Sequence, residues 1–141
     1  MYQNILVQMN KQMIEQMKVR ESCYEILGNL LSDLESYAFR ISGKLEKEKL
    51  FCKYNNNKQK SVNDIKDHII AQIELFKFSY QMYIKNYGNY DFPENLSKQQ
   101  VINFLQKWKS IIHEQKQHIF YDAVIEIING NFNISLNNLF L

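Results

Sequence analysis

Two pairs of side chains have a spacing that could place metal ligands on helices. Asp64 lies four residues before His68, and Glu114 lies four residues before His118. Residues four apart share one face of a helix, and carboxylates and imidazoles from facing helices build the metal sites of helical bundles. These four residues are the candidate metal ligands of the chain. Their spacing differs from the Glu-x-x-His pattern of di-iron bundles, so we favour the interpretation that they are solvated polar pairs beside the apolar stripes.

The other reactive residue types form no recognised catalytic pattern. The sequence contains no Gly-rich phosphate loop, no Cys-x-x-Cys and no Gly-x-Ser-x-Gly motif. Cys23 adjoins Tyr24 within an apolar stripe and is predicted to be a small core filler. Cys52 lies near Lys49 and Lys53, which could lower the pKa of its thiol, but no histidine is near it in sequence. We therefore predict no enzymatic activity and no cofactor, with both cysteines as free thiols in a reducing compartment.

Positive charge gathers between residues 44 and 60, where six lysines accompany two glutamates. Such a cluster could contact anionic lipid headgroups or nucleic-acid phosphates. The candidates for contact with an anionic surface are Lys49, Lys53, Lys58 and Lys60. The net charge of +2 is too small to indicate a nucleic-acid partner. The simpler interpretation is a solvated helix end, where lysines interact favourably with the C-terminal dipole.

The spacing of apolar residues predicts the helices that carry these groups. One proline, Pro93, and four glycines in 141 residues leave long stretches with an apolar residue at every third or fourth position. The predicted elements are helices over about 2–53, 62–89 and 97–129, with an exposed polar loop at 53–60. The first helix carries a heptad seam that starts at Leu6, as in a coiled coil or a broad bundle face. The third begins at the capping box of Ser97 and Gln100.

Together these elements predict a single all-α domain over residues 1–141. The second and third helices form an antiparallel hairpin about the Pro93 turn, and the longer first helix packs along it. The product is a three-helix bundle or an extended helical hairpin. We expect the first helix to overhang the hairpin by several turns, and an exposed apolar overhang calls for a partner chain. The tail at 131–141 carries no charge and is predicted to pack on the bundle or on a partner.

Membrane insertion and secretion are not expected. No run of about 18 uncharged apolar residues is present, so no membrane span is predicted. The N-terminal residues lack the basic-then-apolar order of a secretory signal. The prediction is an intracellular protein.

One stretch of the second helix has a counterpart in a known family. The residues Asp64-Ile65-Lys66-Asp67-His68-Ile69-Ile70, continuing through Glu74 to Tyr87, have an order of acidic, basic and aromatic residues that resembles the last helix of the BAR-type domains of sorting nexins. The resemblance extends over about residues 64–92. It implies a helical dimerisation module with a basic patch that faces a membrane.

The favoured hypothesis is a non-enzymatic helical subunit that joins an assembly by helix packing, as a homo-oligomer or a hetero-oligomer. Its predicted partner-binding residues are apolar positions of the first helix and the tail: Leu27, Leu31, Leu34, Ile41, Phe132, Ile134, Phe140 and Leu141. The first alternative is a BAR-like module associated with a membrane surface. The second alternative is a metal protein built on a helical bundle.

Overall fold

The structure of the chain is a computed structural model that describes residues 2–42 and 62–134. These residues form four α-helices and no β-strand, which confirms the predicted all-α class. The helices are α1 (Tyr2–Ser42), α2 (Val62–Tyr87), α3 (Lys98–Ser110) and α4 (Ile119–Ile128), with short 3-10 turns at Glu94–Leu96 and Gln115–Gln117. The predicted loop at 53–60 and the predicted end of the first helix lie outside the described residues.

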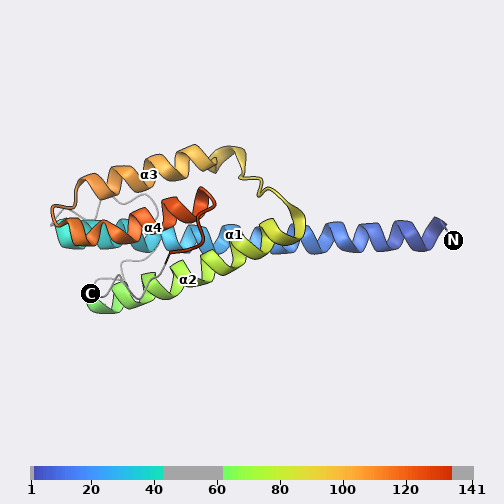
Figure 1. Ribbon diagram of the computed structural model, residues 1–141, viewed down its shortest axis with the longest axis horizontal. Helices are drawn as coiled ribbons and strands as arrows, with labels where there is room; N and C mark the ends of the chain where they lie inside the picture. The colour runs from blue at the N-terminus through green and yellow to red at the C-terminus, as the bar shows by residue number, and fades with distance from the viewer. Residues whose placement is uncertain (1, 43–61, 135–141) are drawn as a thin grey trace.

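Helices α1 and α2 pack against each other antiparallel along most of α2 (Figure 1). At 1.5 Å per residue, the 41 residues of α1 extend over roughly 60 Å and the 26 residues of α2 over roughly 40 Å. The N-terminal end of α1 therefore projects beyond the other helices, as Figure 1 shows. This confirms the overhang that the sequence predicts.

The predicted helix over 97–129 is wrong, because it is two helices, and the predicted hairpin of the second and third helices is replaced by packing of α2 against α1 and α4. Helix α3 ends at Ser110, and α4 starts at Ile119 and runs back alongside α3 (Figure 1). The apolar row that contains Trp108 and Ile112 resumes only at Ile119, because residues 113–118 are all polar. A straight helix would carry the apolar residues of α4 away from the bundle. The reversal instead buries Phe120, Tyr121, Val124, Ile127 and Ile128.

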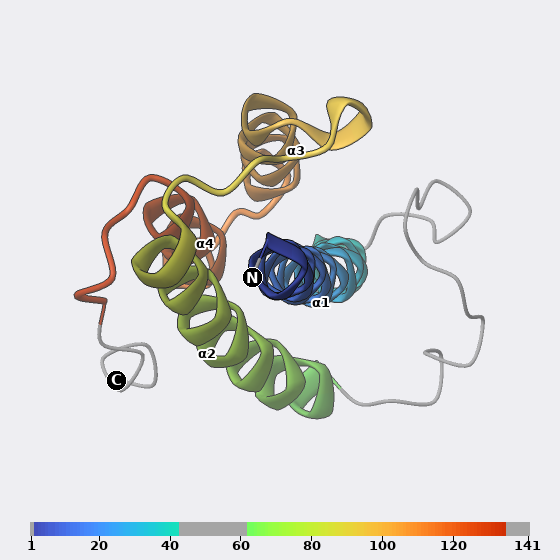
Figure 2. The same cartoon turned by 90° about the vertical axis from the view of Figure 1, so that its right-hand side faces the viewer.

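The core lies between α1 and the arc formed by the other three helices. Figure 2, which looks along α1 from its N-terminal end, shows α3, α4 and α2 around one side of α1. Cys23, Leu27, Leu31 and Leu34 of α1 are fully buried in this core. The C-terminal half of α1 is covered most completely, with every residue from Leu34 to Phe39 buried.

The ends of α2 and α3 follow the signals in the sequence. Gly88 ends α2 with a φ of 90°, a left-handed conformation that glycine adopts without strain, and its amide donates to the carbonyl of Ile84 at 2.9 Å. The Ser97 hydroxyl accepts from the amide of Gln100 at 3.3 Å, and the Gln100 side chain accepts from the amide of Ser97 at 2.8 Å. The predicted capping box at the start of α3 is confirmed.

Candidate functional site

The histidine of the first candidate metal pair bonds to a different helix. His68 donates a hydrogen bond from Nδ1 to the Oδ2 atom of Asp33 in α1, at 2.6 Å. Asp33 lies 35 residues away in the sequence and was not part of the predicted pair. The contact ties α2 to α1 near the end of the bundle where α2 begins. Its geometry is that of a helix–helix polar contact rather than of a metal site.

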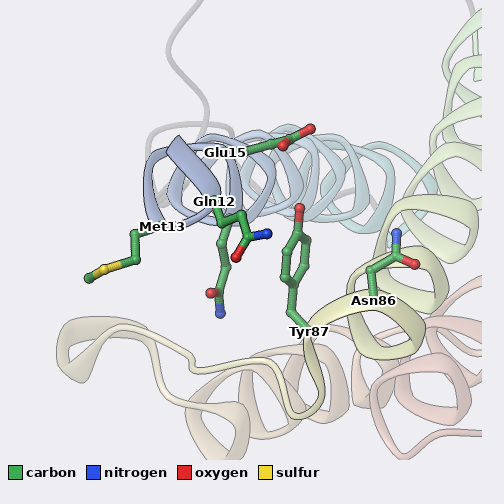
Figure 3. Close-up of a pocket in the computed structure, with 6 residues that line it drawn as sticks. Gln12, Met13, Glu15, Asn86 and Tyr87 are labelled. Carbon is green, nitrogen blue, oxygen red and sulfur yellow. The ribbon is translucent and has the colours of Figure 1, made fainter. Parts of the chain in front are cut away.

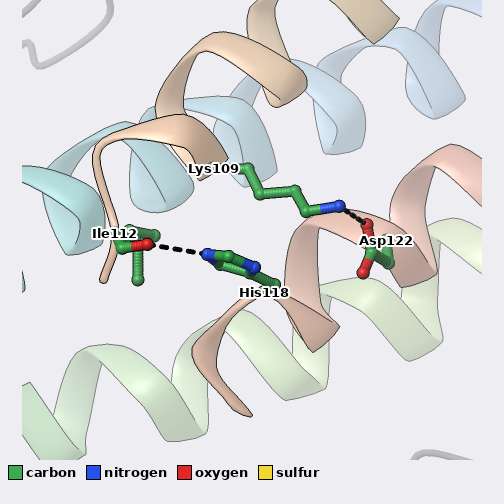
Figure 4. Close-up of polar contacts among 4 residues, drawn as sticks. All are labelled: Lys109, Ile112, His118 and Asp122. Carbon is green, nitrogen blue, oxygen red and sulfur yellow. Dashed lines mark hydrogen bonds and ion pairs between the residues drawn. The ribbon is translucent and has the colours of Figure 1, made fainter. Parts of the chain in front are cut away.

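The second candidate pair lies in the connection between α3 and α4. His118 donates from Nε2 to the carbonyl oxygen of Ile112 at 2.7 Å, and Lys109 forms an ion pair with Asp122 at 2.6 Å (Figure 4). Glu114 is exposed and lies 3.9 Å from Lys116. Within residues 2–42 and 62–134, no three or more His, Cys, Asp or Glu side chains converge as a metal would require. The four candidates therefore do not come together into one site.

Cys23 lies in the core, where the sequence placed it. Its side chain is fully buried, and desolvation raises the pKa of the thiol to about 12. A thiol in this state is protonated at neutral pH and shielded from substrates, so it cannot act as a nucleophile. Cys52 and the four candidate lysines Lys49, Lys53, Lys58 and Lys60 lie outside the described residues.

The predicted partner surface needs a correction at its centre. Leu27, Leu31 and Leu34 are 0% exposed, so the chain's own helices cover them and they offer no contact area to a partner. The reason is that α1 packs along α2, while α3 and α4 complete the core around the C-terminal half of α1. Ile41 is half-buried and packs against the same core.

The beginning of the tail also belongs to the chain's own bundle. The ring of Phe132 lies 6.1 Å from that of Tyr80 between centroids, and the carbonyl of Ile134 accepts from Lys77 Nζ at 3.1 Å. Both tail residues are half-buried against the core. Phe140 and Leu141 lie outside the described residues.

Exposed apolar residues are found instead near the N-terminal end of α1. Met13 is 60% exposed, Ile14 52% and Met17 48%. Met13 and Met17 are four residues apart and share one helix face, which we call the α1 methionine face. Steps of seven residues lead from Met13 to Arg20 and Leu27, and from Met17 to Tyr24 and Leu31. The α1 methionine face thus continues the row that is buried further along the same helix.

This face borders a notch where α2 stops. A pocket of about 410 Å³ lies between Gln12, Met13, Glu15 and Gln16 of α1 and Asn86 and Tyr87 of α2. Figure 3 shows Met13 pointing away from Tyr87. Gln16 Nε2 donates to the hydroxyl of Tyr83 at 3.1 Å. The lining consists of amides, one carboxylate, one phenol and one thioether, which supply no paired acid and base for catalysis.

Residue spacing alone would not have distinguished this exposed end of the seam from its buried part. Both parts carry apolar residues in the same two rows. The only signal is length, since α1 was predicted to outlast α2.

Comparisons of the chain with protein-family models, with curated proteins and with solved structures found no match. Among the described residues, no helix combines the length and the hydrophobicity that crossing a membrane requires.

Proposed function

We propose that this chain is a non-enzymatic helical subunit that docks on a helix of a partner protein through the α1 methionine face. The observation that supports the proposal is the exposure of Met13 and Met17 on α1 where α2 ends at Tyr87 and α1 continues past it. A short helical segment without tertiary contacts is only marginally stable in water. A partner helix that covers the projecting end would supply those contacts.

The position of the notch specifies the kind of helix that fits. A helix laid on α1 beyond Tyr87 would continue the place that α2 occupies further along the same row. Methionine is unbranched and adapts to an irregular apolar surface, which suits a partner with leucine or isoleucine at positions three and four apart. Gln12, Gln16 and Asn86 border the notch with neutral amides. The partner helix is therefore expected to be apolar on one face, with uncharged polar residues beside that face.

The two alternatives have less support from the described residues. The membrane-surface alternative depends on lysines at 49–60, which lie outside them. The metal alternative requires Asp64, His68, Glu114 and His118 to converge, and two of these hold other partners. The partner-helix proposal depends only on residues that the structure describes, and the side chains of Met13 and Met17 are exposed.

The proposal can be tested with a matched pair of α1 variants. Met13→Lys combined with Met17→Lys places two charges on the docking face, and Gln8→Lys combined with Ser22→Lys places two charges on the opposite, exposed face. Proteins captured from the native cells by the wild-type chain are identified, purified and titrated against all three forms by calorimetry. We expect the dissociation constant to rise at least tenfold for the methionine variant, about 1.4 kcal/mol, and to change little for the control.

The result has a clear negative form. Equal affinity of all three forms for every captured protein would contradict the proposal. So would a loss of binding in the Gln8 and Ser22 control that matches the loss in the methionine variant. The proposal would also be overturned if none of the captured proteins, once purified, binds the wild-type chain.

A further inference from the structure

Helix α2 carries a second exposed apolar row, on the side that faces away from the core. Leu75 is 51% exposed, Phe78 64% and Met82 36%. Their spacing of three and four residues places them on one helix face, which we call the α2 outer stripe. The inward row of α2, with Ile73, Phe76 and Tyr80 among its members, is buried in the bundle. The stripe therefore makes no contribution to the core.

Charged residues are arranged along one edge of this stripe. Asp67 and Glu74 lie toward the N-terminal end of α2, and Lys85 lies toward the C-terminal end. All three are exposed, and among the described residues none of them takes part in an ion pair. At 100° per residue, the three side chains project from the same side of the stripe, within about 20° of one another. The edge thus has an acidic end and a basic end.

We propose that the α2 outer stripe binds the same stripe of a second copy of this chain, with the two α2 helices antiparallel about a two-fold axis near Phe78. In this arrangement Phe78 meets its counterpart, and Leu75 meets Met82 of the second copy. Lys85 lies level with Ala71 of the second copy, within about one helical turn of that copy's Glu74 and Asp67. In an antiparallel pair the charged edge of one copy faces the charged edge of the other. The acidic end of each edge therefore meets the basic end of the other, and their charges neutralise each other.

Charge also selects the orientation. In a parallel pair about a two-fold axis, the charged edge of each copy would face the opposite edge of the second copy's stripe, so Lys85 would have neither Glu74 nor Asp67 of that copy beside it. The antiparallel pair instead brings opposite charges together at both ends of the edge. A two-fold interface of this kind is closed, so association stops at the dimer.

The size of the interface sets the expected affinity. One pair of helices provides a contact near the lower end of the range for specific interfaces, where complexes are weak and reversible. We therefore expect a monomer–dimer equilibrium in the micromolar range. The dimer uses different residues from the α1 methionine face, so this proposal and the proposed function can succeed or fail separately.

The test is sedimentation equilibrium of the full chain over a wide concentration range. We expect the average mass of the wild-type chain to rise from one chain toward two. Phe78→Lys should raise the dissociation constant at least tenfold, whereas Gln106→Lys, at an exposed site on α3, should change it less than threefold. The Met13→Lys and Met17→Lys variant should dimerise like the wild-type chain.

Charge reversal tests the antiparallel register directly. Lys85→Glu and Glu74→Lys should each weaken the dimer, and the two changes combined should restore it toward the wild-type value. Residues 74 and 85 are about 16 Å apart along one helix, so rescue by the double change requires contact between two copies. Both sites are exposed, and circular dichroism should show unchanged helix content for each variant.

Three outcomes would overturn the proposal. The first is a wild-type chain that stays monomeric throughout the concentration range. If Phe78→Lys then also lowers the melting temperature, the stripe is covered by other residues of the same chain. The second is a Phe78→Lys variant that dimerises as well as the wild-type chain. The third is a double charge reversal that binds no better than either single change.

Discussion

Single tyrosine hydroxyl groups provide the polar contacts that cross the core of this bundle. Tyr121 donates to the carbonyl of Leu34 at 2.6 Å, Tyr80 to that of Ile128 at 3.2 Å, and Tyr90 to that of Arg20 at 3.1 Å. Each ring fills apolar space while its hydroxyl meets a backbone acceptor, so that none of these three hydroxyl groups is buried without a partner. Each bond also fixes the position of one helix or loop relative to another.

Removing one of these hydroxyls should have a measurable cost. Tyr121→Phe keeps the ring but loses the hydrogen bond to Leu34, and we expect the free energy of unfolding to fall by about 1 kcal/mol. Urea denaturation followed by circular dichroism measures this change. Tyr87→Phe, at a half-buried ring on the same bundle, is the control and should change stability by less than about 0.5 kcal/mol. Equal effects of the two substitutions would show that the Tyr121 hydroxyl contributes nothing specific.

Residue roles that depend on local context could be predicted, and those that depend on distant partners could not. Cys23 was correctly predicted as a core filler, because its apolar row identifies its environment. His68 was assigned to Asp64 because they are neighbours on one helix, yet its hydrogen bond goes to Asp33 of another helix. Sequence spacing within one helix contains no information about which residue of a second helix lies opposite.

At the scale of the helices, the capping and glycine signals in the sequence marked helix ends correctly. The turn between α3 and α4 has no such signal, so it was not predicted. Ser97 and Gln100 form the predicted capping box, and Gly88 ends α2. The connection at 111–118 contains neither proline nor glycine, so the sequence predicts a helix that continues across it. The run of six polar residues at 113–118 was the available clue. The turn is decided by tertiary burial of Phe120 and its neighbours, which local sequence does not report.

The capping box of Ser97 and Gln100 should contribute measurably to the free energy of unfolding. Ser97→Ala removes the acceptor for the Gln100 amide, and we expect the free energy of unfolding to fall by about 1 kcal/mol. Ser97→Asp keeps a cap and should retain most of the wild-type stability. Thermal and urea unfolding of the three forms provide the comparison. If alanine and aspartate at this position gave the same stability, the cap would not be a source of stability for α3.

For the molecule as a whole, the sequence predicted the overhang of α1 but misplaced the surface it offers. The heptad seam runs through both the projecting and the enclosed part of the helix, so periodicity could not show where the bundle ends. Only the arrangement of α2, α3 and α4 shows that the side chain of Leu31 is buried and that of Met17 is exposed. The same arrangement leaves Phe78 of α2 exposed.

The buried thiol and phenols should make the folded state sensitive to alkaline pH. Burial raises the pKa of Cys23 and of Tyr37 to about 12 each, and the nearby Glu114 carboxylate adds to the effect on Tyr37. Desolvation also raises the pKa of Tyr80, Tyr90 and Tyr121. In the unfolded chain these groups lose their protons at about pH 8.5 for cysteine and 10 for tyrosine. Between these values and the folded-state pKa, the unfolded chain binds fewer protons, so stability falls as pH rises.

We therefore expect the urea midpoint to stay nearly constant from pH 7 to 8 and to decrease steadily from pH 9 to 11. Cys23→Ala removes the group with the lowest unfolded-state pKa, so its midpoint should fall less steeply between pH 8.5 and 10 than that of the wild-type chain. Tyr121→Phe should flatten the curve above pH 10 instead, because only a phenol is lost. A midpoint that stays level or rises between pH 8 and 11 would mean that these groups titrate alike in the folded and unfolded chains. In that case the core would admit water to Cys23 and to the tyrosine hydroxyls, contrary to the burial of their side chains.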